Sequence, residues 1–210
     1  VKLDTGKKSI SPISEQETSA FLSALNDFYH TSHFNDFFDT HSYVYEPALR
    51  LFNDSIMKHF DQEWYTRFYG TPPTEQFRII IGFTNGPCNY GPSRKLTGQP
   101  KEVFAIMNYA VDDNEQPVFY KKIVETVVHE FCHSFTRIKG DTGKALEKSG
   151  KALQEYTYSS MRRQAYGTWR NILEESLVRA ATICYLIDHD YDEKDIRKAI
   201  IEQVDRNFFW

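Results

Sequence analysis

The alternation of apolar and polar residues divides the chain into a helical N-terminal part, a short region of strands and a second helical part. Residues 15–70 carry apolar positions at spacings of three and four, which is typical of amphipathic helices. Ser14 followed by Glu17 is a helix-start signature, and the sequence GTPP at residues 70–73 ends the helical pattern. Residues 1–14 are polar and rich in Ser and Lys, so we expect a loose arm there.

Two segments in the middle of the chain predict strands. Residues 76–83 and 102–111 are short and rich in β-branched or aromatic residues, as buried strands are. The segment 84–101 between them is rich in Gly and Pro and predicts turns. A helix is expected next, from Pro117 in its first turn to about Lys139, because its apolar residues form one stripe.

Three further helices are expected, over roughly 144–166, over roughly 168–188 and from Asp192 onward. No internal repeat or linker interrupts the pattern. We therefore predict a single α+β domain over residues 1–210.

Composition narrows the possible functions. The 210 residues are 40% hydrophobic and 26% charged, which suits one folded domain rather than a disordered chain. The net charge of −4 gives no general attraction to nucleic acid. No apolar run approaches the roughly 18 residues of a membrane helix, so we expect no membrane insertion. Three cysteines without a CxxC pair exclude a zinc ribbon and a thioredoxin-like motif.

The helix expected after Pro117 contains the motif H-E-x-x-H, with His129, Glu130 and His133. Residues four apart lie one above the other on a helix, so both imidazoles can bind one zinc ion. Glu130 is rotated by about 100° from His129 and is placed to act on a metal-bound water as a base. Chance alone gives roughly 0.02 such matches in a chain of this composition, so the motif is a strong signal.

Two histidines leave a catalytic zinc short of its usual three protein ligands. The metzincin continuation is absent, because Thr136 and Lys139 stand where it needs Gly and His. A carboxylate on a later helix is the best-placed donor, and Glu174 and Glu175 both lie in the largely apolar run 171–187. A carboxylate on a buried helix needs a compensating partner, which a metal supplies. The residue pattern leaves Glu174 and Glu175 open as alternatives.

The sequence VVHEFCHSF, followed by a helix carrying ESLVRA, resembles the gluzincin metallopeptidases, whose third zinc ligand is a Glu on a downstream helix. More closely, it resembles an uncharacterised bacterial family of secreted or envelope-associated proteins. The resemblance covers residues 77–188, the expected catalytic core, and implies a zincin-like fold with a small, mostly antiparallel sheet. It implies Glu175 as the ligand, with an inserted helix between Glu175 and His133. Arg179, four residues later, would orient that carboxylate.

The resemblance also suggests where a substrate binds. In zincins an edge strand ahead of the active-site helix pairs with an extended peptide. By position this edge is residues 88–91, so Asn89 and Tyr90 are the expected substrate-binding residues. A donor to the developing oxyanion is expected between the two ligand helices, and we choose Tyr166. The other candidates there are Tyr156, Tyr158 and Arg170.

Together these features predict a zinc-dependent metallopeptidase that hydrolyses peptide bonds with a zinc-activated water. The alternatives are a zincin-fold protein that binds metal or has a structural role without turnover, and a metal-dependent hydrolase of other bonds. We expect a peptide or protein substrate and a monomeric chain. A secreted, periplasmic or cell-envelope location follows from the resemblance alone. Val1 in place of Met is typical of a chain cut from a longer precursor, but neither end of the sequence indicates targeting.

Overall fold

The computed structural model describes residues 14–84, 86, 89–120 and 122–208. The expected loose arm lies outside this range except for Ser14. The helical stretch predicted over residues 15–70 is confirmed as a series of separate helices. They are α1 (Glu15–Thr31), α2 (Phe34–Thr40), α3 (Ser42–Ser55), the 3₁₀ turn η1 (Met57–His59) and α4 (Glu63–Tyr69).

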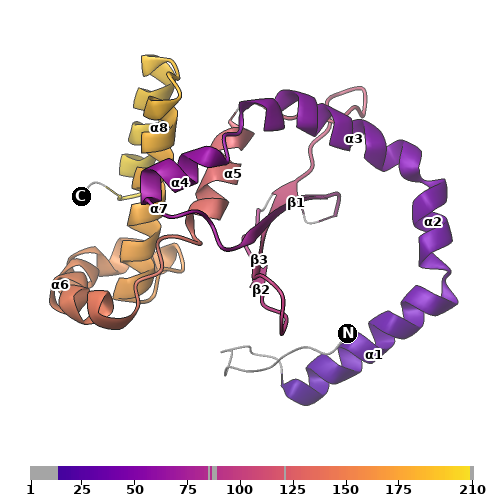
Figure 1. Cartoon of the computed structure of the whole chain (residues 1–210), viewed down its shortest axis with the longest axis horizontal. Coiled ribbons are helices and arrows are strands. Elements are labelled where there is room, and N and C mark those ends of the chain that lie inside the picture. Colours follow the sequence, from indigo (N-terminus) through magenta and orange to yellow (C-terminus); the bar gives the residue numbers. More distant parts are fainter. Residues whose placement is uncertain (1–13, 85, 87–88, 121, 209–210) are drawn as a thin grey trace.

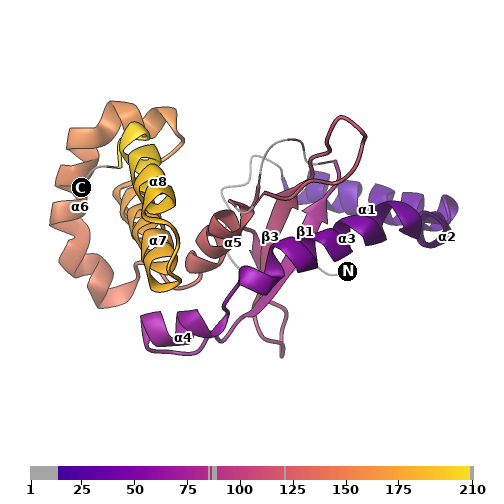
Figure 2. The same ribbon diagram turned by 90° about the horizontal axis from the view of Figure 1, so that it is seen from above.

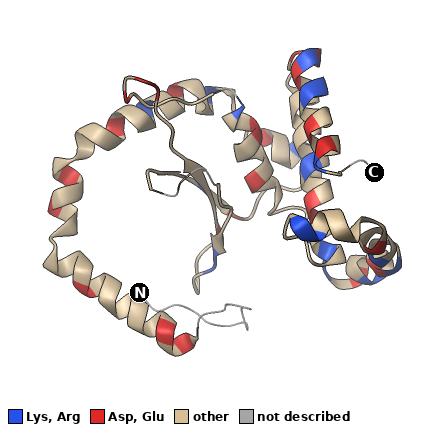
Figure 3. Cartoon of the chain, turned by 180° about the vertical axis from the view of Figure 1, so that it is seen from behind, with Lys and Arg blue, Asp and Glu red and all other residues tan. Residues whose placement is uncertain are grey.

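Helices α1 and α2 extend away from the body of the protein (Figure 1). The predicted start of α1 is confirmed by a capping box, in which Ser14 and Glu17 each satisfy a backbone N–H of the other. Neither helix buries a residue, whereas α3 buries Ala48 and Phe52. Figure 3 marks Asp and Glu positions in red on α1 and α2, and neither helix contains a Lys or an Arg. The core of the domain therefore begins at α3.

The three strands form one sheet in the order β1 (Gln76–Gly82), β3 (Glu102–Asn108), β2 (Ser93–Arg94). The α+β class is confirmed, but the sheet is mixed rather than mostly antiparallel. β1 and β3 are parallel along all seven residues, and only the short β2 is antiparallel to β3. The chain reverses direction twice, once into β2 and once into β3, so β3 runs in the direction of β1.

One buried carboxylate joins the three strands. Glu102, at the start of β3, is only 5% exposed and forms ion pairs with Arg78 of β1 and Arg94 of β2. The charge of a buried carboxylate has to be compensated, and two guanidinium groups do this here. Hydrogen bonding from Arg94 also holds the pKa of Glu102 below its ordinary value. The arrangement fixes the edge strand against the centre of the sheet.

The helix that carries the motif, α5 (Ile123–Cys132), is shorter than predicted at both ends. Pro117 lies outside it, in an extended segment that forms an isolated bridge with Val111. The Asp112 side chain accepts the backbone N–H groups of Asn114 and Gln116, which closes a tight turn ahead of Pro117. At its other end the helix gives way to tighter turns, in which the N–H groups of Ser134 and Phe135 bond to the carbonyls of Phe131 and Cys132 three residues back.

Three long helices complete the domain, near the predicted ranges: α6 (Gly140–Arg163), α7 (Trp169–Asp188) and α8 (Glu193–Asp205). Helix α5 lies between the sheet on one side and α7 on the other (Figure 2). A continuous core of buried residues runs from α3 through the sheet and α5 to α7 and α8. Among the described residues, none of the helices has the combination of length and apolar character that crossing a bilayer requires.

Helix α6 approaches α7 closely at Gly150. A Cβ atom added there would lie 2.5 Å from a ring carbon of Trp169 and 3.2 Å from a methyl group of Leu173. No Cβ can be accommodated at that distance without moving the indole, which is itself only 8% exposed. The glycine therefore sets the separation of α6 and α7.

We predict that Gly150→Ala destabilises the protein by up to about 2 kcal/mol. Overpacking costs about 1–3 kcal/mol, and the better helix propensity of Ala returns about 1 kcal/mol. Gly143→Ala on the same helix is the control, because its Cβ would meet Arg170 at 3.4 Å and Ile138 at 3.8 Å, which are ordinary van der Waals distances. Urea denaturation of both variants tests this. Equal stability of the two would contradict the packing argument.

Candidate metal centre

Helices α5 and α7 bring three potential metal ligands together. His129 lies in the last turn of α5, and His133 is its C-terminal cap residue. Glu175 lies on the buried face of α7 and is 5% exposed. One ligand atom from each residue lies within 4.8 Å of the other two. Within the part of the chain that the structure describes, this is the single group of His, Cys, Asp and Glu with such an arrangement.

The distances in this cluster suit a shared cation better than hydrogen bonds. His129 Nε2 is 3.5 Å from Glu175 Oε1, and His133 Nε2 is 3.6 Å from Glu175 Oε2. Both are longer than the roughly 2.7–3.2 Å of a hydrogen bond. Ligands about 2.0–2.1 Å from a tetrahedral zinc ion lie about 3.3–3.5 Å from one another. Two imidazoles and one carboxylate are also a common donor set for zinc, so the residues present fit this metal.

The structure separates the two candidate glutamates. Glu174 Oε1 accepts the backbone N–H of Ile138 at 2.8 Å, so Glu174 is bound to the segment that follows α5. The Ile138 N–H thus has its partner on α7 rather than in its own segment. Glu175 instead faces the two histidines. The geometry therefore places Glu175, and not Glu174, in the cluster.

Arg179 contacts Glu175 as the sequence predicts. Its Nη2 is 2.7 Å from Glu175 Oε1, one helical turn away on α7. Both side chains are close to fully buried, at 11% and 7% exposure. This ion pair compensates part of the carboxylate charge and fixes its orientation, as an outer partner of a metal ligand commonly does.

Burial sets the protonation states of the motif residues. It lowers the pKa of His129 to about 4 and also lowers the pKa of His133, although Glu175 opposes both shifts. Both imidazoles are then neutral at pH 7, as metal ligands have to be. Burial, with a smaller contribution from the charge of Glu175, raises the pKa of Glu130 to about 7. A carboxyl group with this pKa suits proton transfer near neutral pH.

The edge of the sheet lies directly beside Glu130. Tyr90 pairs with Ile106 of β3 through two backbone hydrogen bonds, of 3.0 and 2.8 Å. In the next residue, Gly91, an added Cβ would lie 2.3 Å from Glu130 Oε2. Only a glycine leaves room for the carboxylate at this point. The sequence shows this residue as one of several turn glycines, and nothing local indicates its contact with Glu130.

The predicted substrate-binding residues have different surroundings. The Tyr90 side chain is 50% exposed. Asn89 uses its side chain within the fold, because its Oδ1 accepts the backbone N–H of Asn108 at 2.8 Å. Cys88, also part of the predicted edge, lies outside the described residues. The antiparallel edge is thus present at Tyr90. The side chain of Asn89 is used in a hydrogen bond within the fold.

Tyr166 lies beside Arg179 and Glu175. Arg179 Nη2 approaches the Tyr166 hydroxyl at 3.4 Å, and burial beside Glu175 raises the pKa of this hydroxyl. The structure therefore brings Tyr166 to the ligand carboxylate. Its predicted role toward an oxyanion stays a prediction. Among the other candidates, Tyr156 is 78% exposed and the Tyr158 hydroxyl accepts a bond from Arg162.

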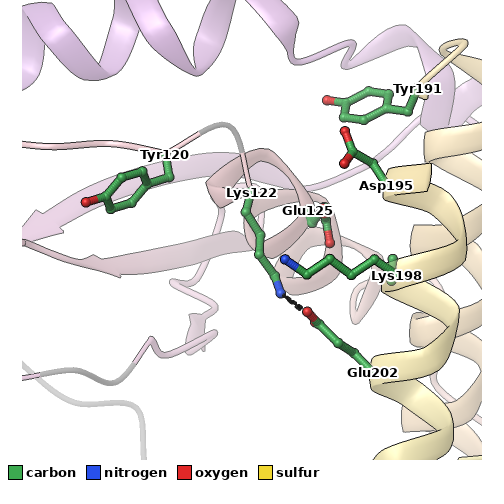
Figure 4. A pocket seen from close by; sticks show the side chains of 8 residues that line it. Tyr120, Lys122, Glu125, Tyr191, Asp195, Lys198 and Glu202 are labelled. Carbon is green, nitrogen blue, oxygen red and sulfur yellow. Dashed lines mark hydrogen bonds and ion pairs between the residues drawn. The ribbon is translucent and has the colours of Figure 1, made fainter. Parts of the chain in front are cut away.

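A separate cavity of about 250 Å³ lies at the other end of α5 (Figure 4). Glu125 lines it near Lys198 of α8, and Lys122 forms an ion pair with Glu202 across it. This cavity contains none of the motif residues. Glu125 is therefore a carboxylate on the same helix as Glu130 but in a different environment.

The fold and the cluster define an α+β protein with an HExxH motif and a downstream glutamate at metal-binding distance. The chain belongs to a family described as a domain of unknown function (DUF4932), whose model matches residues 4–209. No curated protein matches the chain. No solved structure matches it either.

We predict that the wild-type protein binds one zinc ion per chain and that Glu175→Gln weakens binding at least about tenfold. The amide keeps the shape of the side chain but is a poor zinc ligand. Glu174→Gln is the matched control and should keep the metal, because its amide oxygen can still accept the Ile138 N–H. Elemental analysis and competition with a chromophoric chelator measure this. Loss of zinc in Glu174→Gln alone would contradict the assignment.

Proposed function

We propose that this protein is a zinc-dependent metallopeptidase of the gluzincin type. The observation that supports this most strongly is the spacing of His129, His133 and Glu175 around one point. Glu130 lies between the two histidines on the same segment, and the charge of Glu175 acts on its carboxyl group. The two histidines come from α5 and its C-terminal cap, and Glu175 comes from α7, a helix further along the sequence, as the resemblance implies. The fourth zinc position would be left for water or substrate.

The residues of the chain have separate tasks in this reaction. His129, His133 and Glu175 would hold the ion. When bound, zinc supplies Lewis acidity, which polarises a carbonyl and makes a water molecule more acidic. Glu130 accepts the proton of that water as it attacks the peptide carbonyl, and then donates the proton to the leaving amine. Its pKa of about 7 in the metal-free protein allows both steps near neutral pH.

An extended peptide can pair with the edge of the sheet. In an antiparallel pair, backbone groups point alternately toward the partner strand and away from it. The N–H and C=O of Tyr90 both bond to Ile106, so those of Gly91 point outward. A peptide bound there would lie next to Glu130. Backbone pairing gives affinity with little demand on sequence.

The exposure of the ligands favours an enzyme over a non-catalytic protein with the same fold. The side chains of His129 and His133 keep 21% and 34% of their surface accessible. A site closed by α1 and α2 would favour the non-catalytic alternative, but those helices bury none of their residues. In the described part of the chain, the exposure of both imidazoles supports access by a substrate. Export to the periplasm or cell surface is part of the proposal and rests on the sequence resemblance.

We predict that Glu130→Gln lowers kcat/KM for a peptide substrate by about 10²–10⁴-fold and leaves the zinc content at one ion per chain. The variant keeps the size of the side chain and removes the base. Glu125→Gln on the same helix is the control and should retain activity. Turnover of a quenched fluorescent peptide library measures both. Near-normal turnover by Glu130→Gln would remove Glu130 from the mechanism.

We predict that Gly91→Ala lowers kcat/KM by about 100-fold with unchanged zinc content. The added methyl group displaces the Glu130 carboxylate, and a shift of about 1 Å in a catalytic group has an effect of this size. Gly167→Ala is the control, because no atom lies within 4 Å of its Cβ position. The same peptide assay applies. Full activity of Gly91→Ala would show that the carboxylate does not need this position.

A further inference from the structure

The guanidinium group of Arg179 is held from two sides. On one side its Nη2 contacts Glu175, as described above. On the other side its Nη1 donates to Gln203 Oε1 of α8 at 2.5 Å. The Nε atom is buried and has no hydrogen-bond partner among the described residues. The two Nη atoms therefore provide the hydrogen bonds that fix this buried cation.

Gln203 is itself fixed in one orientation. Its Nε2 donates to the backbone carbonyl of Ala199 on the preceding turn of α8, at 3.1 Å. This bond leaves Oε1 facing Arg179. The side chain of Phe208 covers the guanidinium, whose carbon lies 4.4 Å from the ring centroid, and the same ring contacts Tyr166 edge-on. The last helix and the turn after it thus form the support of Arg179.

We propose that Gln203 is a positioning residue for the metal centre, acting through Arg179 on the ligand Glu175. The proposal rests on the metal site proposed above. It assigns a function to the C-terminal helix, which contributes no residue to the HExxH cluster itself.

The physical reason is competition for the carboxylate. An Arg guanidinium prefers to bind a carboxylate through two parallel hydrogen bonds. With Nη1 bound to Gln203, Arg179 contacts Glu175 through Nη2 at Oε1, which also faces His129, and Oε2 faces His133. Without the Gln203 acceptor, a buried N–H of Arg179 loses its hydrogen-bond partner. Turning the guanidinium toward Glu175 would give this N–H a new acceptor and lower the free energy. A guanidinium that holds both oxygens would compete with the metal.

The test compares two substitutions of nearly the same size. Gln203→Met removes the acceptor, whereas Gln203→Glu keeps an oxygen that can accept from Arg179. Gln116→Met, in the exposed turn before α5, is the matched control. The readout is the zinc dissociation constant of each metal-free protein, measured by competition with a chelator. Thermal unfolding in EDTA is measured in parallel.

We predict that Gln203→Met weakens zinc binding about three- to tenfold, less than the 10–100-fold typical of residues in direct contact with a ligand. Gln203→Glu and Gln116→Met should bind zinc within about twofold of wild type. In an Arg179→Met background, Gln203→Met should have no further effect on zinc affinity, because the residue acts only through Arg179.

Three results would overturn the positioning role. They are an unchanged zinc affinity in Gln203→Met, an equal loss in Gln203→Glu, and a full additional loss in the Arg179→Met background. A fall in metal-free stability that accounts for the whole loss of affinity would also do so. Zinc binding without peptide hydrolysis would contradict the proposed enzyme and leave this role intact. Failure of the wild type to bind zinc would overturn both proposals.

Discussion

The structure around the candidate site depends on the compensation of one buried carboxylate. Glu175 lies on the face of α7 that packs against α5, where a charge without a partner is strongly unfavourable. Arg179 supplies an opposite charge on one side, and the two histidines of α5 face the other. Neutral imidazoles at these distances do not complete the compensation by hydrogen bonding. A divalent cation between them would do so, and under the proposed function its binding would stabilise the contact between α5 and α7.

The remaining parts of the fold place other groups around that contact. The ion pairs of Glu102 hold the edge of the sheet, and the edge in turn brings Gly91 against Glu130. Gly150 lets α6 lie close to α7 and so limits the movement of the helix that carries Glu175. Helix α8 supports Arg179 from behind. Elements distant in sequence therefore converge on one short helix.

Helices α1 and α2 differ from the rest of the described chain. Their sequence predicts amphipathic helices, and the structure forms them without burying their apolar sides. Phe21, Phe28 and Leu25 are about half exposed or more. Helix propensity and the capping box at Ser14 account for α1 locally, since no tertiary contact buries it. The spacing of apolar residues in the sequence does not say whether another part of the protein packs against the apolar side of a helix.

The sequence by itself determined the parts of the site that depend on local geometry. The four-residue spacing of His129 and His133 places both imidazoles on one face wherever the helix lies. Glu175 also follows Ile172 and precedes Val178 at spacings of three, in the buried stripe of α7, which is a signal in its favour over Glu174. The prediction of an α+β domain follows from the same periodicities.

Tertiary structure decided everything that depends on neighbours far along the chain. Helix α5 begins only after the extended segment that contains Pro117, and it gives way to tighter turns at Ser134 and Phe135. Neither change alters the local apolar pattern. The parallel pairing of β1 and β3 depends on two chain reversals. The contacts of Gly91 with Glu130 and of Gln203 with Arg179 join residues 39 and 24 positions apart. Periodicity carries information over one or two turns, whereas such contacts arise only when separate elements pack together.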